Sequence, residues 1–392
     1  MLKKNQFNRQ ELAGSFGDIG TDLPLLVGMI QAVNLNSASV FIMFGLMQIL
    51  AGFFYGLPMP MQPLKAMAVL VITEKIPGEI LFGAGLAIGV VMLALTVSGA
   101  LQWLAKFIPL CVVRGIQFGL GLSLASLALK TYIPSSGVAG YGLAILGFVV
   151  MIATPAKSRF PAAFFLIGAG VLYALAVQLP VATIISGIQF TLPQLHQPTW
   201  HDILTGFVIL SLPQLPLSLS NSVIATHQTL KDLFPTHPVP IQRIGFTYSL
   251  ANLILPFFGG IPLCHGCGGL AGHYALGART GGSVIFYGAL YLIIGLFFSQ
   301  VFAEVVQVFP QPILGVILFF EALTLLLFIS DQAVSRRQFI IALCVGLIAF
   351  SLPQGYLVGL LVGITIYYSA NRISFFRDQD SSSIIEETKP KL

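Results

Sequence analysis

Charged residues and cysteines are scarce in this chain of 392 residues. Asp, Glu, Lys and Arg make up 8% of the sequence, against about 25% in soluble domains, which excludes a soluble globular protein. The four cysteines lie in or beside apolar runs, which argues against an extracellular disulfide framework. The sequence also lacks a Walker loop, a dinucleotide fingerprint and a nucleophile elbow, so it does not predict an ATP-driven pump.

Apolar residues are abundant, at 56% of the total, and they form runs that recur from end to end. We expect fourteen hydrophobic elements and therefore an all-α polytopic membrane protein. The third and tenth elements are too short to cross a bilayer as complete helices, which need about 20 residues. The expected elements are 13–33, 39–57, 61–74, 80–104, 109–129, 138–154, 161–180, 203–227, 242–258, 265–277, 282–303, 310–329, 337–351 and 355–370.

The distribution of basic residues predicts that both termini are cytoplasmic. With fourteen elements, sixteen of the 19 lysines and arginines fall on the cytoplasmic side. Lys75 and Lys130 fall outside, and Lys65 lies within the membrane. This pattern explains the net charge of +5 without a nucleic-acid partner, and it predicts a multi-pass protein of the cell (inner) membrane.

The two halves of the chain share a pattern of breaks at an offset of roughly 190 to 205 residues, which is typical of transporter repeats. Residues 21–24 interrupt the first element, and residues 213–216 interrupt the eighth. Because seven is odd, a second set of seven elements starts on the opposite side of the membrane, and the repeat is inverted. The predicted organisation is a cytoplasmic N-terminal tail (1–12), a first repeat (13–180), an extracytoplasmic linker (181–202), a second repeat (203–370) and a short cytoplasmic tail (371–392) without a soluble regulatory domain.

Two short stretches, residues 57–67 and 259–269, carry Pro and Gly where a membrane helix should run unbroken. We expect half-helices at the third and tenth elements, each with free N–H groups and a positive dipole end inside the membrane. Such paired breaks mark the substrate site of transporters, and the sign of the dipole favours an anion.

Element 203–227 bears a polar stripe of Ser211, Gln214, Ser218 and Asn221 on one helical face. The stripe either lines a cavity or supplies hydrogen bonds between helices. We favour the cavity, because the stripe follows a break with two prolines.

Three charged residues lie in the first and third elements. Asp18 and Asp22 share a helical face, and they either couple transport to an ion or proton or hold the break as a cap or salt bridge. Lys65 follows the break in the third element, and its partner is either an anionic substrate or one of these two aspartates. Gln62 can donate two hydrogen bonds to an oxyanion.

The run from Cys264 to Cys267 has three soft ligands, but no second cluster of Cys or His completes a zinc framework. The glycines at 266 and 268 fit backbone amides that form an anion nest. His265 either donates to an oxyanion or packs between helices. Glu321, alone in the apolar run 310–329, is expected to pair with a helix end or a neighbour, with ion coupling as the alternative.

Several motifs, taken in order, resemble molybdate transporters of the sulfate-permease-like type. This resemblance covers roughly residues 11 to 372. It implies seven plus seven inverted helices, with elements 1–4 and 8–11 in a core domain and 5–7 and 12–14 in a gate domain. One departure is Cys267, where Ala is more usual in the family. The motifs are residues 17–21 (Gly-Asp-Ile-Gly-Thr), 58–65, 113–117, 214–222 with 232–235, and 264–272.

The resemblance implies high-affinity, secondary active uptake of molybdate, with tungstate as a competitor, and no enzymatic activity, cofactor or metal. The alternatives are a proton-coupled sulfate or nucleobase transporter and, in another class, a membrane-embedded metalloenzyme that uses Cys264, His265 and Cys267. The expected partners are the molybdate oxyanion and the lipid bilayer, and the choice between a monomer and a homodimer stays open. The candidate substrate site comprises Thr21, Gln62, Lys65, Gln214, Ser218, Asn221, His265, Gly266, Cys267 and Gly268, with Asp18 and Asp22 as candidate coupling residues.

Overall fold

The computed structural model describes residues 4–154, 160–174 and 185–369. The predicted tail 371–392 lies outside these residues, as do the end of the predicted element 161–180 and the start of the predicted linker 181–202. The described chain is mostly helical. Its helices in the first half are α1 (Arg9–Gly14), α2 (Ile19–Val33), α3 (Ser37–Tyr55), α4 (Lys65–Glu74), α5 (Gly78–Val97), α6 (Ala100–Phe107), α7 (Leu110–Leu127), α8 (Gly137–Ala153) and α9 (Ala162–Tyr173).

The second half is likewise mostly helical. Its helices are α11 (Trp200–Gly206), α12 (Leu212–Leu217), α13 (Thr226–Leu233), α14 (Ile241–Ile254), α15 (Cys267–Ala275), α16 (Gly282–Phe297), α17 (Ser299–Val308), α18 (Gln311–Leu327), α19 (Arg336–Ser351) and α20 (Gly355–Ser369). Two strands complete the fold, β1 (Met61–Pro63) before α4 and β2 (Leu263–His265) before α15.

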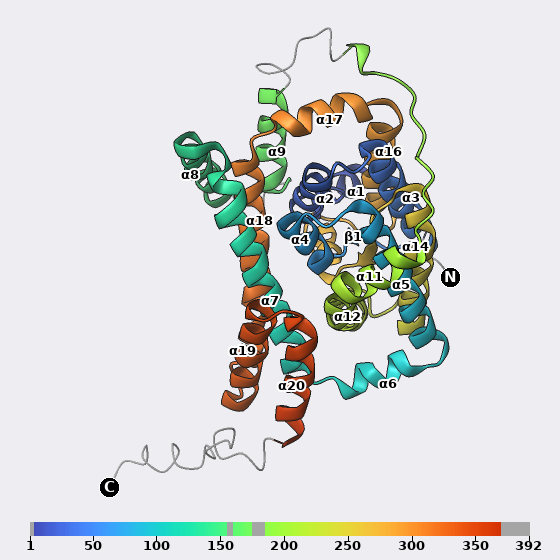
Figure 1. The fold of residues 1–392 in the computed structure, drawn as a ribbon, viewed down its shortest axis with the longest axis vertical. Helices are drawn as coiled ribbons and strands as arrows, with labels where there is room; N and C mark the ends of the chain where they lie inside the picture. Colours follow the sequence, from blue (N-terminus) through green and yellow to red (C-terminus); the bar gives the residue numbers. More distant parts are fainter. Residues whose placement is uncertain (1–3, 155–159, 175–184, 370–392) are drawn as a thin grey trace.

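The helices form two groups that lie side by side (Figure 1). One group contains α1–α5 and α11–α16, and the other contains α7–α9 and α18–α20. Two helices connect the groups, α6 at one end of the molecule and α17 at the other (Figure 1). Within the first group α3 packs along α16, and α5 packs along α14. In these two pairs a helix of the first half packs against a helix of the second half.

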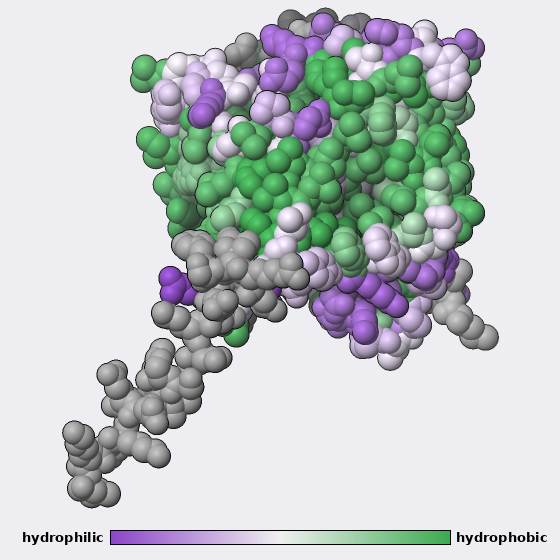
Figure 2. All heavy atoms as spheres, turned by 60° about the horizontal axis from the view of Figure 1, so that its bottom comes forward, coloured by the Kyte–Doolittle hydropathy of each residue, from purple (hydrophilic) through white to green (hydrophobic). Residues whose placement is uncertain are grey.

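The surface is apolar around the middle of the molecule. Figure 2 shows a broad hydrophobic band between two hydrophilic margins. Large apolar side chains such as Val138, Ile152 and Leu146 are exposed, which a lipid environment favours. Among the described residues, five helices are long and apolar enough to cross a membrane, or six if the bent pair α16 and α17 forms one span. The five are Ser37–Tyr55, Gly78–Val97, Leu110–Ala153, Trp200–Leu233 and Gln311–Gln332.

The boundaries of the fourth and eleventh expected elements were wrong, because each contains a sharp bend. The expected run 80–104 is two helices, α5 and α6, separated at Gly99, whose φ of 75° is the left-handed region that favours glycine. The expected run 282–303 is likewise divided into α16 and α17, with a bend of 95°. A continuous apolar pattern does not reveal such a bend.

The expected boundary between elements 109–129 and 138–154 falls at irregular turns between α7 and α8, and the break expected inside element 203–227 is irregular helix rather than an interruption. Helical residues are consecutive from Leu110 to Ala153, but a π-helical turn at Ala128–Tyr132, a 3-10 turn at Ile133–Ser136 and Gly137, with a φ of 57°, separate α7 from α8. Trp200–Leu233 is a helix of 34 residues with π-helical turns at Phe207–Ser211 and Ser218–Ala225. Prolines 213 and 216 lie between these two turns, and their missing N–H groups account for the irregular hydrogen bonding.

The chain is not purely helical, as the sequence had led us to expect, because β1 and β2 pair as an antiparallel two-stranded ladder. Met61 lies opposite His265, and Pro63 lies opposite Leu263. Prolines break the helix before each strand, which leaves the backbone polar groups in need of partners. The ladder satisfies the inner edges of both strands, and α4 and α15 begin immediately after it.

Side-chain amides complete the outer edges of this ladder. Gln48 of α3 donates to the carbonyl of Met61 (2.6 Å) and accepts from its N–H (2.9 Å). Asn252 of α14 does the same for Leu263, at 2.6 and 3.0 Å. Both amides are completely buried. The ladder is therefore supported in the same way on both edges, by one buried amide from α3 and one from α14.

Candidate functional site

The amino termini of α4 and α15 lie on either side of the ladder, and they differ in how their first N–H groups are satisfied. The Gln214 side chain accepts hydrogen bonds from the amides of Ala66 (3.0 Å) and Met67 (3.2 Å), and so caps α4. In α15 the N-cap residue is Gly266, which has no side chain to cap the helix, and among the described residues no side-chain oxygen is shown to accept from the first amides. The amino end of α15 therefore keeps the partial positive charge that attracts an anion.

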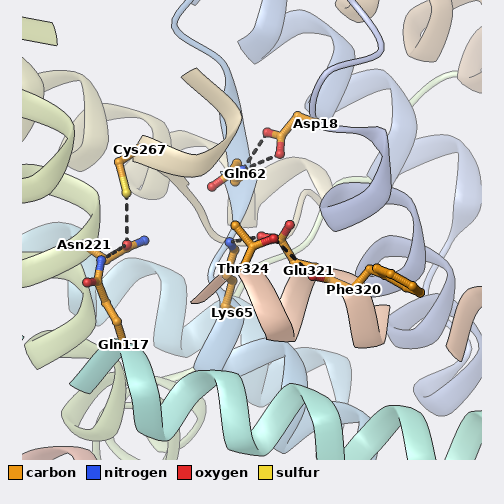
Figure 3. A network of polar contacts seen from close by, with 9 residues as sticks. All are labelled: Asp18, Gln62, Lys65, Gln117, Asn221, Cys267, Phe320, Glu321 and Thr324. Carbon is orange, nitrogen blue, oxygen red and sulfur yellow. Dashed lines mark hydrogen bonds and ion pairs between the residues drawn. The ribbon is translucent and has the colours of Figure 1, made fainter. Parts of the chain in front are cut away.

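Lys65, the first residue of α4, is paired with a carboxylate of the other helix group. Its Nζ lies 3.1 Å from Oε1 of Glu321 on α18 (Figure 3). The Lys65 side chain is 4% exposed and that of Glu321 is 19% exposed. The sequence suggested an aspartate or a substrate as the partner of Lys65, and it did not suggest Glu321. The only signal was that Glu321 is the lone acid of an apolar run.

A polar cluster joins the amino end of α15 to α7 and to the π-helical turn Ser218–Ala225. The Asn221 Oδ1 accepts hydrogen bonds from the Gln117 amide (2.8 Å) and from the Cys267 thiol (3.3 Å), as Figure 3 shows. Gln117 in turn accepts from Arg114 at 3.0 Å. Sequence reasoning did not name Gln117 as a site residue, although it lies in the motif 113–117.

Asp18 and Asp22 are buried behind the ladder and make separate hydrogen bonds. Gln62 Nε2 lies 2.6 Å from both carboxylate oxygens of Asp18, and the Thr21 hydroxyl also bonds to this group. Asp22 accepts from the Tyr287 hydroxyl at 3.2 Å. Within the described part of the chain, its other oxygen has no hydrogen-bond partner, nor does the side-chain oxygen of Gln62. The Asp22 oxygen can therefore accept a proton or a cation, and the Gln62 oxygen can accept a hydrogen bond or a cation.

Close packing at this point requires glycine in α15 and just before it. A Cβ on Gly269 would overlap the Asp18 carboxylate, and one on Gly266 would overlap the Gln62 amide. Gly268 differs, because the heavy atom nearest to its Cβ position is Oε1 of Glu321, at 3.9 Å. There is therefore free space at Gly268, on the side that faces the ion pair.

Other predicted site residues bond to neighbouring helices. Ser218 contacts the Tyr248 hydroxyl at 2.7 Å and accepts from Gln214 at 3.3 Å. Ser211 donates to the carbonyl of Ala84 at 2.9 Å. The four residues of the predicted stripe thus contact five different helices, α4, α5, α7, α14 and α15, and Asn221 is the one that bonds to the amino end of α15.

The three soft ligands of the run 264–267 have three different partners. His265 uses both ring nitrogens, with Nδ1 3.2 Å from the carbonyl of Pro60 and Nε2 2.8 Å from the hydroxyl of Thr247. Cys264 bonds to Ser222, whereas Cys267 bonds to Asn221. Among the described residues, no three His, Cys, Asp or Glu side chains form a group that could hold a metal ion.

A cavity of about 740 Å³ leads to the amino end of α15. Cys267 and Ala271 of α15 contribute to its wall, together with basic, polar and acidic side chains from α6, α7 and α13, among them Lys106, Arg114 and Asp232. An anion that enters the cavity therefore reaches the uncapped helix end and the cluster around Asn221. The wall of the cavity includes Gln102, Lys106, Arg114, Gln228, Cys267 and Ala271.

Comparisons with known proteins agree with a membrane transporter. A sequence profile of the family described as "Molybdate transporter of MFS superfamily" matches residues 10–124 and 206–325. Molybdate transporter 2 of Arabidopsis thaliana is 30% identical over 97% of this chain and 93% of its own length. Molybdate transporter 1 of the same plant is 30% identical over 93% of this chain and 90% of its own length.

Solved structures with the same fold are anion transporters by their titles. The transmembrane domain of the cyanobacterial bicarbonate transporter BicA aligns with a TM-score of 0.65 over 91% of this chain and 96% of that domain, at 15% identity. SLC26A9 aligns with a TM-score of 0.67 over 93% of this chain and 65% of its own, also at 15% identity. At this level of identity the likeness concerns the fold alone.

Proposed function

Because the chain belongs to the molybdate transporter family and is therefore a transporter rather than an enzyme, we propose that its substrate is the molybdate dianion, with tungstate as a competitor. The supporting observation is that the uncapped amino end of α15 and the buried Lys65 ammonium lie on either side of the same free space. A helix end and a cation together favour an oxyanion. The cavity beside α15 provides a path to it from one side.

The charges balance only with the lysine included. A helix end contributes roughly half a positive charge, so two ends contribute about one against the two negative charges of molybdate. Gln214 already accepts hydrogen bonds from the first amides of α4, which leaves the end of α15 as the stronger of the two. Lys65 supplies the missing charge.

We assign different roles to the predicted site residues. Lys65, Asn221, Cys267 and Gly268 contact the anion, since they surround the free space or the inner end of the cavity. The remaining residues hold the helix ends in position through the contacts described above. These residues are Thr21, Gln62, Gln214, Ser218, His265 and Gly266.

The finer architecture that we propose is a 14-element inverted repeat. Strands β1 and β2, the short helices that follow them, and the reciprocal packing of α3 on α16 and α5 on α14 all support it. Helices α4 and α15 act as half-helices. The group of α1–α5 and α11–α16 is the core, the group of α7–α9 and α18–α20 is the gate, and residues 13–180 and 203–370 form the two repeats.

The transport cycle alternates access by movement of the core against the gate. We propose that Asp18 and Asp22 couple this movement to a proton or cation, because each group of the pair is fully buried and Asp22 has an unpaired oxygen. The protein lies in the cell (inner) membrane with both termini in the cytoplasm. A second copy of the chain is its proposed partner, as a homodimer.

Equilibrium binding to the purified full-length protein tests the substrate. Calorimetry with molybdate, tungstate, sulfate, bicarbonate and uracil should give tight binding of molybdate and tungstate and much weaker binding of the other three. Equal affinity for sulfate would overturn the selectivity. Binding of uracil alone would overturn the anion assignment and favour a nucleobase transporter.

A further inference from the structure

Glu321 lies where the proposed substrate would lie. Its carboxylate is 3.1 Å from the Lys65 ammonium, and its Oε1 is the nearest heavy atom to the side of Gly268 that faces the free space. The carboxylate is therefore held between the cation and the amino end of α15, as Figure 3 shows for the ion pair. An oxyanion bound at the same two groups cannot share the space with Glu321.

The two partners of the ion pair belong to different helix groups. Helix α4 packs mainly on α2, with smaller contacts to α12 and α7, whereas α18, which carries Glu321, packs mainly on α7 and α8 and also touches α2 and α9. The Lys65–Glu321 pair is thus one of several contacts between the two groups. Movement of one group against the other must therefore stretch or break this contact. The difference in exposure, 4% for Lys65 and 19% for Glu321, means that Glu321 is the partner with access to water when the pair separates.

We propose that Glu321 is an internal anion that occupies the substrate position in the empty transporter and leaves it when the substrate oxyanion binds. This inference rests on the proposed function, because it needs an anion at Lys65. An unpaired ammonium in a buried site costs several kcal/mol. Glu321 removes that penalty in the absence of substrate, and a bound dianion removes it in the presence of substrate.

As an internal anion, Glu321 would be needed for net uptake but not for exchange. In exchange, the site carries an anion in both directions, and Lys65 is always paired with substrate during the movement. In net uptake, the empty site must return, and among the described residues Glu321 is the carboxylate within ion-pair distance of Lys65. Loss of the carboxylate should therefore block net uptake and spare exchange. A purely structural ion pair would affect both modes alike.

Glu321→Gln tests the proposal, with Glu304→Gln as the matched control, since Glu304 is an exposed acid on α17. The purified full-length variants are compared in proteoliposomes for equilibrium binding of molybdate, molybdate–molybdate exchange and net uptake into empty vesicles. Glu321→Gln should lower the Kd for molybdate by about ten-fold, because the Glu321 carboxylate no longer occupies most of the empty sites. Exchange should persist, net uptake should be lost, and the control should match the wild type in all three measurements.

Unchanged or weaker binding in Glu321→Gln, or a parallel loss of exchange and net uptake, would overturn the proposal. If Glu321→Gln does not yield folded protein, Glu321→Asp replaces it. The shorter carboxylate keeps its charge but reaches Lys65 less well, so the same shifts are expected at smaller size, and their absence counts equally against the proposal. Failure of the wild type to bind molybdate would instead overturn the proposed substrate, and the three measurements would then use whichever of sulfate or bicarbonate it binds.

Discussion

Lys65→Gln is the most direct test of the charge balance at the site. The substitution removes the ammonium group that pairs with Glu321 at 3.1 Å, and that we propose pairs with the dianion. Truncation of one partner of a buried, hydrogen-bonded charge pair costs about 2–5 kcal/mol. Since 1.4 kcal/mol is a tenfold change, this corresponds to a loss of affinity between about 30-fold and a few thousand-fold. Because Glu321 competes for the same ammonium, we expect a value near the lower end.

The measurement is calorimetric titration of detergent-solubilised full-length protein with molybdate, together with a melting temperature. Lys231→Gln is the control, because Lys231 is an exposed residue of α13 and the same charge is removed. Lys65→Gln also leaves Glu321 without its partner, so we expect a lower melting temperature. The double variant Lys65→Gln/Glu321→Gln should recover it, since it leaves no buried charge unpaired. Wild-type affinity in a folded Lys65→Gln protein would refute the assignment of Lys65 to the site.

Three further predictions concern the packing of α15, the buried residues Asp18 and Asp22, and the polar cluster around Asn221. Gly269→Ala should lower the melting temperature and the yield of folded protein, because its Cβ would overlap the Asp18 carboxylate. Gly268→Ala should fold normally, and equal melting temperatures for the two variants would contradict the close packing of Gly269 against Asp18. Asp18→Asn and Asp22→Asn should remove the pH dependence of uptake in proteoliposomes while molybdate still binds, and a wild type that transports independently of pH and membrane potential would leave both acids as structural residues. Asn221→Ala should weaken molybdate binding by about ten-fold, the value of one hydrogen bond to a charged group, and an unchanged titration curve would exclude it from the site.

The sequence predicted where the helices break better than it predicted what the breaks contact. Pro60, Pro63 and Pro262 cannot donate backbone hydrogen bonds, so interruptions near 57–67 and 259–269 follow from local chemistry alone. Helix α4 begins two residues after Pro63, and helix α15 begins directly after Gly266. That the two broken segments pair with each other as strands depends on contacts between distant parts of the chain.

The partner of Lys65 shows why the rest could not be predicted. Glu321 is 256 residues from Lys65 along the chain, and a single sequence does not indicate which distant residues are close in space. Asp18 and Asp22 were the nearer candidates along the chain, but the Gln62 side chain and Tyr287 occupy their carboxylates. The bend between α16 and α17 was hidden for a related reason, because an apolar run reads the same whether the helix is straight or bent.

The two-stranded ladder also limits the order in which the protein can be made. Strand β1 and the helix that follows it are complete only when residues 263–265 are present to pair with them. Chain synthesis proceeds at about 5–20 residues per second, so the roughly 200 intervening residues take about 10–40 s to appear. During that time the first broken segment has unpaired backbone groups that lipid cannot satisfy. The nascent first half must therefore keep this segment hydrated or sheltered by the insertion machinery until the second half arrives, and the two halves of the membrane domain mature as a single unit.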